Sequence, residues 1–290
     1  MAEVRPAGPE HFDQVYPLLL RFGHAAMSRE DWRRMLFDLP WPVEEPHRGY
    51  MLLDGDAVVG FLGTIFSRRE LGGATRRICN LSSWIVDERH RTSSFQLLLP
   101  VLSMKSHTIV NLSASREAHE IFRALGFQTL EDRQTLVVPI PGPRDLAGWP
   151  RCSVHLRPEA IRGRLAGAGL RIFDDMRGTL ACQVLLADRE RSCHLVATSS
   201  PWKGRMRLAH IQYASDWTFL TEHGPQAAWA LYRRMGTAGL RLDGRRAGNW
   251  APPLSARRPI LLPQLYRPAE PDMTAQLLDG LYTEVVNQRW

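Results

Sequence analysis

Hydrophobic side chains recur at helical spacing near the start of the chain. Between residues 10 and 22 the apolar positions are Phe12, Val15, Leu18, Leu19 and Phe22, a period that predicts an amphipathic helix. Residues 28–39 predict a second helix, because Ser28 is a favourable N-cap and two acidic residues follow it in the first turn.

The period changes to that of strands in the segment 49–66, GYMLLDGDAVVGFLGTIF. The Asp54-Gly55 dipeptide in its middle accepts the positive φ angles of a tight turn, so a hairpin of two strands is expected there. The polar stretch 67–77 predicts another turn region, and the segment 78–86, ICNLSSWIV, predicts a third strand.

A helical pattern returns at 93–104, where Pro100 is expected to end or kink the helix. Residues 107–114 then predict a short strand. A helix follows at 115–125, capped by Ser115 and stopped by Gly126, and a further strand at 127–138.

Length and composition limit the class of protein. The chain has 290 residues, 44% of them hydrophobic, enough for one large or two modest domains. Its apolar runs are shorter than the ~20 residues of a membrane span, and its first residues lack the apolar core of a signal peptide. These features predict a soluble, cytoplasmic protein. The four cysteines lack zinc-type spacing and are expected to be reduced thiols, with no metal site.

The formal charge of +7 favours an anionic substrate or cofactor. Nucleic-acid-binding proteins gather their basic residues on one face or one helix, whereas the arginines here are spread along the chain. We therefore expect no nucleic acid among the partners.

The segment 86–99, VDERHRTSSFQLLL, connects a predicted strand to a predicted helix. With the elements around it, this segment resembles the GNAT (GCN5-related N-acetyltransferase) superfamily, in which a turn of the form Arg-x-x-Gly-x-Gly or Ala binds the pyrophosphate of coenzyme A. The residues in that register are Arg91, Thr92, Ser93, Ser94, Phe95 and Gln96, with Ser94 and Gln96 in place of the glycines. Helix N-termini attract phosphate, and serine hydroxyls add donors. For this segment alone, an ordinary capped turn remains the alternative.

Residues 115–127 carry the second part of the resemblance. The family's later helix commonly reads Asn-x-x-Ala-x-x-x-Tyr-x-x-x-Gly-Phe, and the residues at those spacings are Ser115, Ala118, Phe122, Gly126 and Phe127. In the family the Asn and Tyr touch the cofactor, and the Tyr often protonates the departing thiolate. Ser115 and Phe122 would hold these places, although Phe122 has no proton to donate.

The resemblance covers residues 3–138 and implies an α/β (α+β) fold with a mixed, mainly antiparallel sheet flanked by helices. The second half of the chain repeats a similar pattern: strands near 180–188, 193–200, 205–214 and 239–244, a helix at 224–235, an irregular strand at 257–268 and a closing helix at 271–286. We therefore expect a tandem form, with a GNAT-like acyl-CoA-binding domain at 1–140, a linker at 141–152 and a degenerate GNAT-like lobe at 153–290.

The resemblance implies direct transfer from acetyl-CoA or another acyl-CoA, with the thioester held between two splayed strands. Backbone N–H groups of Trp84, Ile85 and Val86 would stabilise the oxyanion. The two strands offer no carboxylate or imidazole, so their polar residues could only orient a water or the acceptor: Asn80, Ser82, Ser83, Asn111 and Ser113. Nearby titratable residues, each more often a surface group than a base, are Glu88, His90, His107 and His119.

Aromatic and polar residues of the second half are expected to line either a sugar-binding cleft or ordinary core and rim: Trp202, Lys203, His210, Tyr213, Asp216 and Trp217. Two functions remain open. The first is an acyltransferase that modifies a small amine or hydroxyl acceptor, such as an amino sugar of bacterial surface-polysaccharide synthesis. For this function we expect no membrane span, and a homodimer is one of the expected oligomeric states. The second is an inactive GNAT-like protein that binds a ligand or partner.

Overall fold

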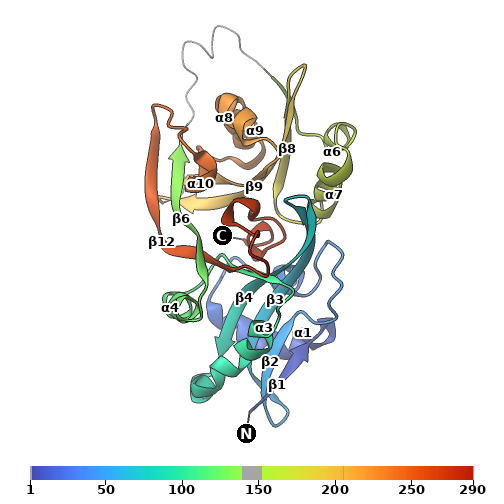
Figure 1. Cartoon of the computed structure of the whole chain (residues 1–290), viewed down its shortest axis with the longest axis vertical. Coiled ribbons are helices and arrows are strands. Elements are labelled where there is room, and N and C mark those ends of the chain that lie inside the picture. Colours follow the sequence, from blue (N-terminus) through green and yellow to red (C-terminus); the bar gives the residue numbers. More distant parts are fainter. Residues whose placement is uncertain (1, 139–151, 205, 290) are drawn as a thin grey trace. The chain divides into compact units, whose positions relative to one another are not determined.

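The computed structural model describes residues 2–138, 152–204 and 206–289, and these residues form two compact units (Figure 1). The first unit consists of Met1–Leu130, Leu262–Leu278 and Tyr282–Arg289. The second consists of Glu131–Leu261 and Asp279–Leu281. Each unit therefore contains segments from both halves of the sequence.

The first half of the chain supplies most elements of the first unit. The strands of the first half are β1 (Glu3–Ala7), β2 (Gly49–Asp54), β3 (Ala57–Leu71), β4 (Ala74–Val86) and β5 (Thr108–Asn111) in this unit, and β6 (Gln128–Val137), which lies mostly in the second unit. The helices of the first unit are η1 (Pro9–His11), α1 (Phe12–Leu19), η2 (Leu20–Phe22), α2 (Arg29–Leu36), η3 (Glu88–Leu97), α3 (Leu98–Leu102) and α4 (Arg116–Ala124).

The sheet of the first unit has the order β1-β2-β3-β4-β5-β12, where β12 is Ser255–Arg267 near the end of the chain. Only β4 and β5 pair in parallel, and the other neighbours are antiparallel. The predicted mixed, mainly antiparallel sheet flanked by helices is therefore confirmed.

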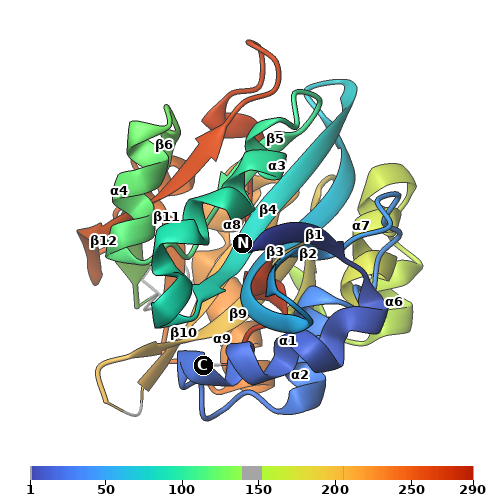
Figure 2. The same cartoon turned by 90° about the horizontal axis from the view of Figure 1, so that it is seen from below.

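Helices cover both faces of this sheet (Figure 2). Phe61 of β3 stacks on Phe37 after α2, with ring centroids 5.7 Å apart. The adjacent Leu62 belongs instead to a buried cluster with Leu98 of α3 and Phe122 of α4. Because neighbouring side chains of a strand point to opposite faces, α2 lies on one face and α3 and α4 lie on the other.

Local signals in the sequence are confirmed at several positions. Ser28 caps α2 and forms a reciprocal capping box with Asp31. Asp54 pairs with Ala57 across the first hairpin, where Gly55 has a φ of +59°. Ser115 caps α4, and Gly126 ends it with a φ of +83°.

Two other predictions for the first unit are confirmed only in part. The turn expected in the polar stretch 67–77 is limited to Gly72 and Gly73, because β3 and β4 pair through the rest of the stretch as far as Leu71 and Ala74. The helical pattern at 93–104 corresponds to the end of the 3-10 helix η3 and the short α3, which ends at Leu102.

The second unit contains the remaining elements. Its strands are β7 (Ser153–His155), β8 (Cys182–Ala187), β9 (Ser192–Trp202), β10 (Met206–Ala214) and β11 (Leu240–Asp243). Its helices are α6 (Pro158–Arg162), α7 (Gly167–Met176), α8 (Trp217–Glu222), α9 (Gly224–Met235) and α10 (Gly244–Ala247). Its sheet runs β7-β8-β9-β10-β11-β6.

The two sheets have the same connectivity. In the second unit only β10 and β11 pair in parallel, as β4 and β5 do in the first. In each unit the strand beside the shorter member of this pair comes from the other half of the chain. β12 pairs with β5 in the first unit, and β6 pairs with β11 in the second. This repetition supports an internal duplication whose final strands have been exchanged.

The prediction of a closing helix at 271–286 is wrong. This segment has only two short 3-10 turns, η4 (Ala275–Leu277) and η5 (Glu284–Val286). Tyr282, between these turns, has a φ of +59°, which is incompatible with a continuous α-helix. Except for Cys152, the predicted linker 141–152 lies outside the described residues. No helix in the described ranges is long and apolar enough to cross a membrane.

Candidate functional site

The parallel strands β4 and β5 stay paired over only part of their length. Their ladder consists of Ile78 with Thr108, Cys79 with Ile109 and Asn80 with Val110. β4 continues to Val86, whereas β5 ends at Asn111. The C-terminal part of β4 therefore extends past the ladder with β5. Ser82, Ser83, Trp84, Ile85 and Val86 all lie in this extension.

A β-bulge interrupts β4 in this extension. Ser82 pairs with Gly63 and Ile85 pairs with Phe61, so Ser83 and Trp84 together lie opposite Leu62. Ser83 has a φ of +56°, which is unusual for a residue other than glycine. Bulges of this kind redirect side chains and backbone groups, and they are frequent beside functional sites.

A carboxylate from the end of the chain lies at the point where the ladder ends. Glu284 accepts hydrogen bonds from the side-chain amide of Asn80 and from the hydroxyl of Ser113. Both Asn80 and Glu284 are buried, with exposed fractions of 0% and 2%, whereas Ser113 is exposed. The Glu284–Ser113 pair therefore connects a buried carboxylate to an accessible hydroxyl.

Burial raises the pKa of Glu284 above its ordinary value of 4.5, and the hydrogen bonds from Ser113 and Asn80 oppose this shift only in part. The oxygen of the Asn80 amide, Oδ1, has no hydrogen-bond partner among the described residues. A raised pKa makes the carboxylate of Glu284 a stronger proton acceptor than an ordinary glutamate.

The C-terminal segment is held against the first unit by several side chains. The Tyr282 ring lies edge-on to Trp41, with centroids 5.2 Å apart, and below the Arg69 guanidinium. Arg289 Nε donates to Asp31 Oδ1 over 3.0 Å. Asp31 and Trp41 belong to α2 and to the chain that follows it. These contacts fix Glu284 on the α2 face of the sheet.

The predicted phosphate turn has a different geometry from the one expected. Residues 91–96 lie inside the 3-10 helix η3, which begins at Glu88, and do not open an α-helix. In such a helix the N–H groups after the first turn bond to the carbonyl three residues earlier. The groups left to meet an anion are the exposed side chains of Arg91 and Thr92 and the half-buried Ser93, Ser94 and Gln96; Phe95 is 43% exposed.

Trp84 and the face of α4 form the other side of the extension of β4. The Trp84 ring lies 5.9 Å from the Phe122 ring, and Phe122 is fully buried. Trp84 Nε1 and His119 Nε2 are buried and have no partner among the described residues. Trp84, on the extended strand end, therefore offers a free donor for a bound ligand. Ser115, by contrast, uses its hydroxyl to cap α4.

Two of the titratable residues singled out in the sequence pair with carboxylates distant from Glu284 in the chain. His90 bonds to Asp54 and His107 bonds to Glu45, over 3.0 and 2.9 Å. Glu88 is exposed. None of these interactions brings His90 or His107 to Glu284.

In the second unit, the residues considered for a sugar cleft are dispersed into local contacts. His210 bonds to Asp243 over 3.3 Å, and Asp216 caps α8. Trp217 packs against the buried core, and Lys203 lies over the Trp202 ring.

Sequence reasoning missed Glu284 because it considered only β4, β5 and their neighbours in the chain. The expected closing helix also obscured Glu284, because a glutamate in an amphipathic helix is normally interpreted as a solvent-exposed residue. A glutamate inside the apolar run around Leu281 and Val286 is the one available clue.

The fold of the chain is similar to that of solved structures described as GCN5-related N-acetyltransferases. One similar solved structure is a GCN5-related N-acetyltransferase from Kribbella flavida, with a TM-score of 0.59 and 15% identity over 92% of this chain and 71% of that one. Another is a GCN5-related N-acetyltransferase from Anabaena variabilis, with a TM-score of 0.56 and 10% identity over 93% and 73%. A probable N-acyltransferase from Enterococcus faecalis also has a TM-score of 0.56, with 11% identity over 93% and 73%.

No family model matches the sequence. No curated protein matches it either. The structural likeness at this low identity therefore defines the fold of the chain.

Proposed function

We propose that the protein is an acyl-CoA-dependent acyltransferase that transfers an acetyl or other acyl group to a small amine or hydroxyl. The observation that carries this proposal is the contact of the buried Glu284 with Ser113 and Asn80 at the end of the β4–β5 ladder. The fold supports the same class of reaction by analogy. A carboxylate at this point supplies the proton acceptor that β4 and β5 themselves lack.

Ser113 and Glu284 form the proposed proton path. The attacking nitrogen or oxygen of the acceptor loses a proton to Ser113 Oγ, while the Ser113 hydroxyl proton passes to Glu284. Because Ser113 is exposed and Glu284 is buried, the hydroxyl gives the acceptor indirect access to the carboxylate. Asn80 holds the carboxylate in place from its other side.

Acyl-CoA supplies a thioester carbonyl, whose carbon–sulfur bond breaks as the bond to the acceptor forms. The backbone N–H groups of Trp84, Ile85 and Val86 are proposed to stabilise the negative charge on the carbonyl oxygen. The bulge at Ser83 supports this role because it redirects the backbone where β4 extends beyond β5. Ser82 and Ser83, whose hydroxyl oxygens lie 3.3 Å apart, would orient the acceptor.

Side chains of η3 are proposed to bind the pyrophosphate of the donor. Arg91 supplies the charge, and the hydroxyls of Thr92, Ser93 and Ser94 supply donors. This differs from a glycine-rich turn, where backbone N–H groups do the same work. The remaining proposed contacts are Phe95 and Gln96 of η3 and Ser115 at the start of α4.

The acceptor class that we propose to test first is an amino sugar, in keeping with a cytoplasmic role in surface-polysaccharide synthesis. A second function is favoured by one observation: Phe122, at the place of the family's tyrosine, is fully buried and offers no acid to the leaving thiolate. The chain would then be an inactive protein that binds a ligand through the same fold.

Calorimetric titration of acetyl-CoA and longer acyl-CoAs separates these functions. We expect binding to the wild type that weakens about tenfold or more in Arg91→Ala, while Arg189→Ala, an exposed charge of the second unit, binds as the wild type does. Release of free thiol in the presence of amino sugars and other amines then measures turnover. Binding without turnover on any acceptor favours the inactive protein. Absence of acyl-CoA binding rules out the acyltransferase.

A further inference from the structure

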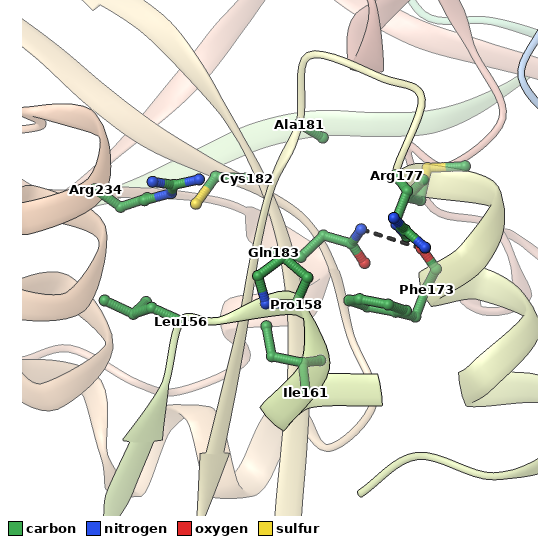
Figure 3. A pocket seen from close by; sticks show the side chains of 10 residues that line it. Leu156, Pro158, Ile161, Phe173, Arg177, Ala181, Cys182, Gln183 and Arg234 are labelled. Carbon is green, nitrogen blue, oxygen red and sulfur yellow. Dashed lines mark hydrogen bonds between the residues drawn. The ribbon is translucent and has the colours of Figure 1, made fainter. Parts of the chain in front are cut away.

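A cavity of about 310 Å³ lies wholly within the second unit (Figure 3). It is bounded by α6, by α7 and the residue that follows it, by the start of β8 and by the end of α9. None of its lining residues belongs to the site around Glu284. Its volume is near the lower limit of cavities that bind small ligands.

The inner wall of the cavity is apolar. Ile161, Phe173 and Met176 have exposed fractions of 1%, 1% and 0%, and Leu156 and Pro158 line the same space. This wall can cover one ring or a short alkyl chain, and burial of such a group is favourable in proportion to its area.

Two guanidinium groups supply the charge of the cavity. Arg177 and Arg234 stand on opposite sides of Gln183 in Figure 3, and no acidic side chain is among the lining residues. The Arg234 guanidinium also lies against the thiol of Cys182. Both arginines are exposed, so neither is part of the core.

The side chain of Gln183 is held between these arginines by hydrogen bonds to both polar atoms of its amide. Its Nε2 donates to the carbonyl oxygen of Phe173 over 3.1 Å, and its Oε1 accepts from His194 Nε2 over 2.9 Å. Burial lowers the pKa of His194 to about 4, so the ring is neutral at physiological pH. The amide therefore presents a rigid, uncharged surface between the two positive charges.

We infer that this cavity binds a small carboxylate with an apolar body, such as an aryl or short-chain alkyl acid. The apolar body contacts Phe173, Ile161 and Met176, and the carboxylate faces Arg234 and Arg177. A cation would meet two like charges there, and a neutral molecule would form no ion pair with either guanidinium group. The site is independent of the acyl transfer proposed above.

Titration of benzoate, phenylacetate and hexanoate in the absence of acyl-CoA tests this inference. Isothermal calorimetry measures affinity, and the ¹³C-methyl signal of Met176 reports where the ligand binds. We expect saturable binding that weakens about tenfold or more in Arg234→Gln and in Arg177→Gln. Arg233→Gln removes the same charge from the neighbouring exposed position of α9 and is expected to bind as the wild type does.

Benzyl alcohol, which has a similar ring and no charge, is expected to bind at least about tenfold more weakly than benzoate. The inference is overturned if no carboxylate binds saturably, if benzyl alcohol binds equally well, or if Arg233→Gln loses as much affinity as Arg234→Gln. A Met176 signal that stays unchanged at saturation would also overturn it. Since no acyl-CoA is present, these outcomes do not depend on the proposed catalytic function.

Discussion

The hydroxyl of Ser113 donates a hydrogen bond to Glu284, which lies 171 positions later in the chain. Ser113 follows β5, and Glu284 begins the last 3-10 turn. The pair brings a buried carboxylate to the end of the β4–β5 ladder, where we propose that the acyl donor binds.

Replacement of Glu284 by glutamine is expected to lower kcat by about 10²–10⁴-fold, because the general base is lost while the side-chain volume is kept. Affinity for acyl-CoA should change little. Turnover and calorimetry measure the two effects. Glu270→Gln is the control, since Glu270 is an exposed carboxylate of the same terminal stretch that pairs with Arg76. Full activity of Glu284→Gln would contradict the proposed base.

Replacement of Ser113 by alanine is expected to lower kcat at least about tenfold, because the acceptor loses its path to Glu284. Ser106→Ala, at another exposed serine, should leave kcat unchanged. If Ser113→Ala matches the wild type in kcat, the acceptor reaches Glu284 directly and the relay is wrong.

The pH dependence of turnover should identify the carboxylate. Burial raises the pKa of Glu284 above 4.5, so its basic form, and with it kcat, increases as pH rises through that raised value. The profile of Glu284→Gln should lack this rising limb, whereas that of Glu270→Gln should retain it. An unchanged limb in Glu284→Gln would assign it to another group.

The stability of the second unit should decrease in acid because of His194. The folded-state pKa of this buried ring is lowered from 6.5 to about 4, so the unfolded state binds the proton more tightly. The contribution is complete above pH 6.5 and decreases as pH falls towards 4, by about 3 kcal/mol in total. Urea unfolding of wild type and His194→Gln between pH 7 and 4 measures it. Parallel pH curves for the two proteins would contradict this assignment.

Met273→Ala is expected to destabilise the first unit by about 2–5 kcal/mol. Met273 is 1% exposed and packs in a cluster with Ile78, Val110 and Tyr266. Thr274→Ala, at the adjacent exposed position, should cost less than about 0.5 kcal/mol. Thermal unfolding of both variants gives the comparison, and equal midpoints would show that the terminal segment contributes little.

Local features of the fold were predictable because their causes lie within a few residues. Ser28 caps α2, Gly55 allows the first hairpin turn and Gly126 ends α4 whatever the rest of the chain does. The polar residues of 67–77 indicated the turn at Gly72 and Gly73 but not the strands beside it, since a hairpin can carry charge on both strands without breaking its backbone pairing.

The candidate site could be predicted only in part. Asn80, Ser83 and Trp84 follow from their position on a strand before a turn, but the partner of Asn80 depends on contacts across more than half of the chain. Residues 91–96 looked like a helix start, but they lie inside the 3-10 helix η3, whose end at Leu97 is buried in the core together with Leu98. Such non-local packing leaves no periodic signal in the sequence.

The exchange of final strands also imposes an order on biosynthesis. β5 leaves the ribosome long before its antiparallel partner in β12 has been made. At ~5–20 residues per second, the edge of β5 waits on the order of 10–30 s for that partner. During this interval the nascent first unit presents an unpaired strand edge, the kind of surface on which chaperones act and neighbouring chains pair. Production of the protein should therefore depend more on chaperone supply than its final stability suggests.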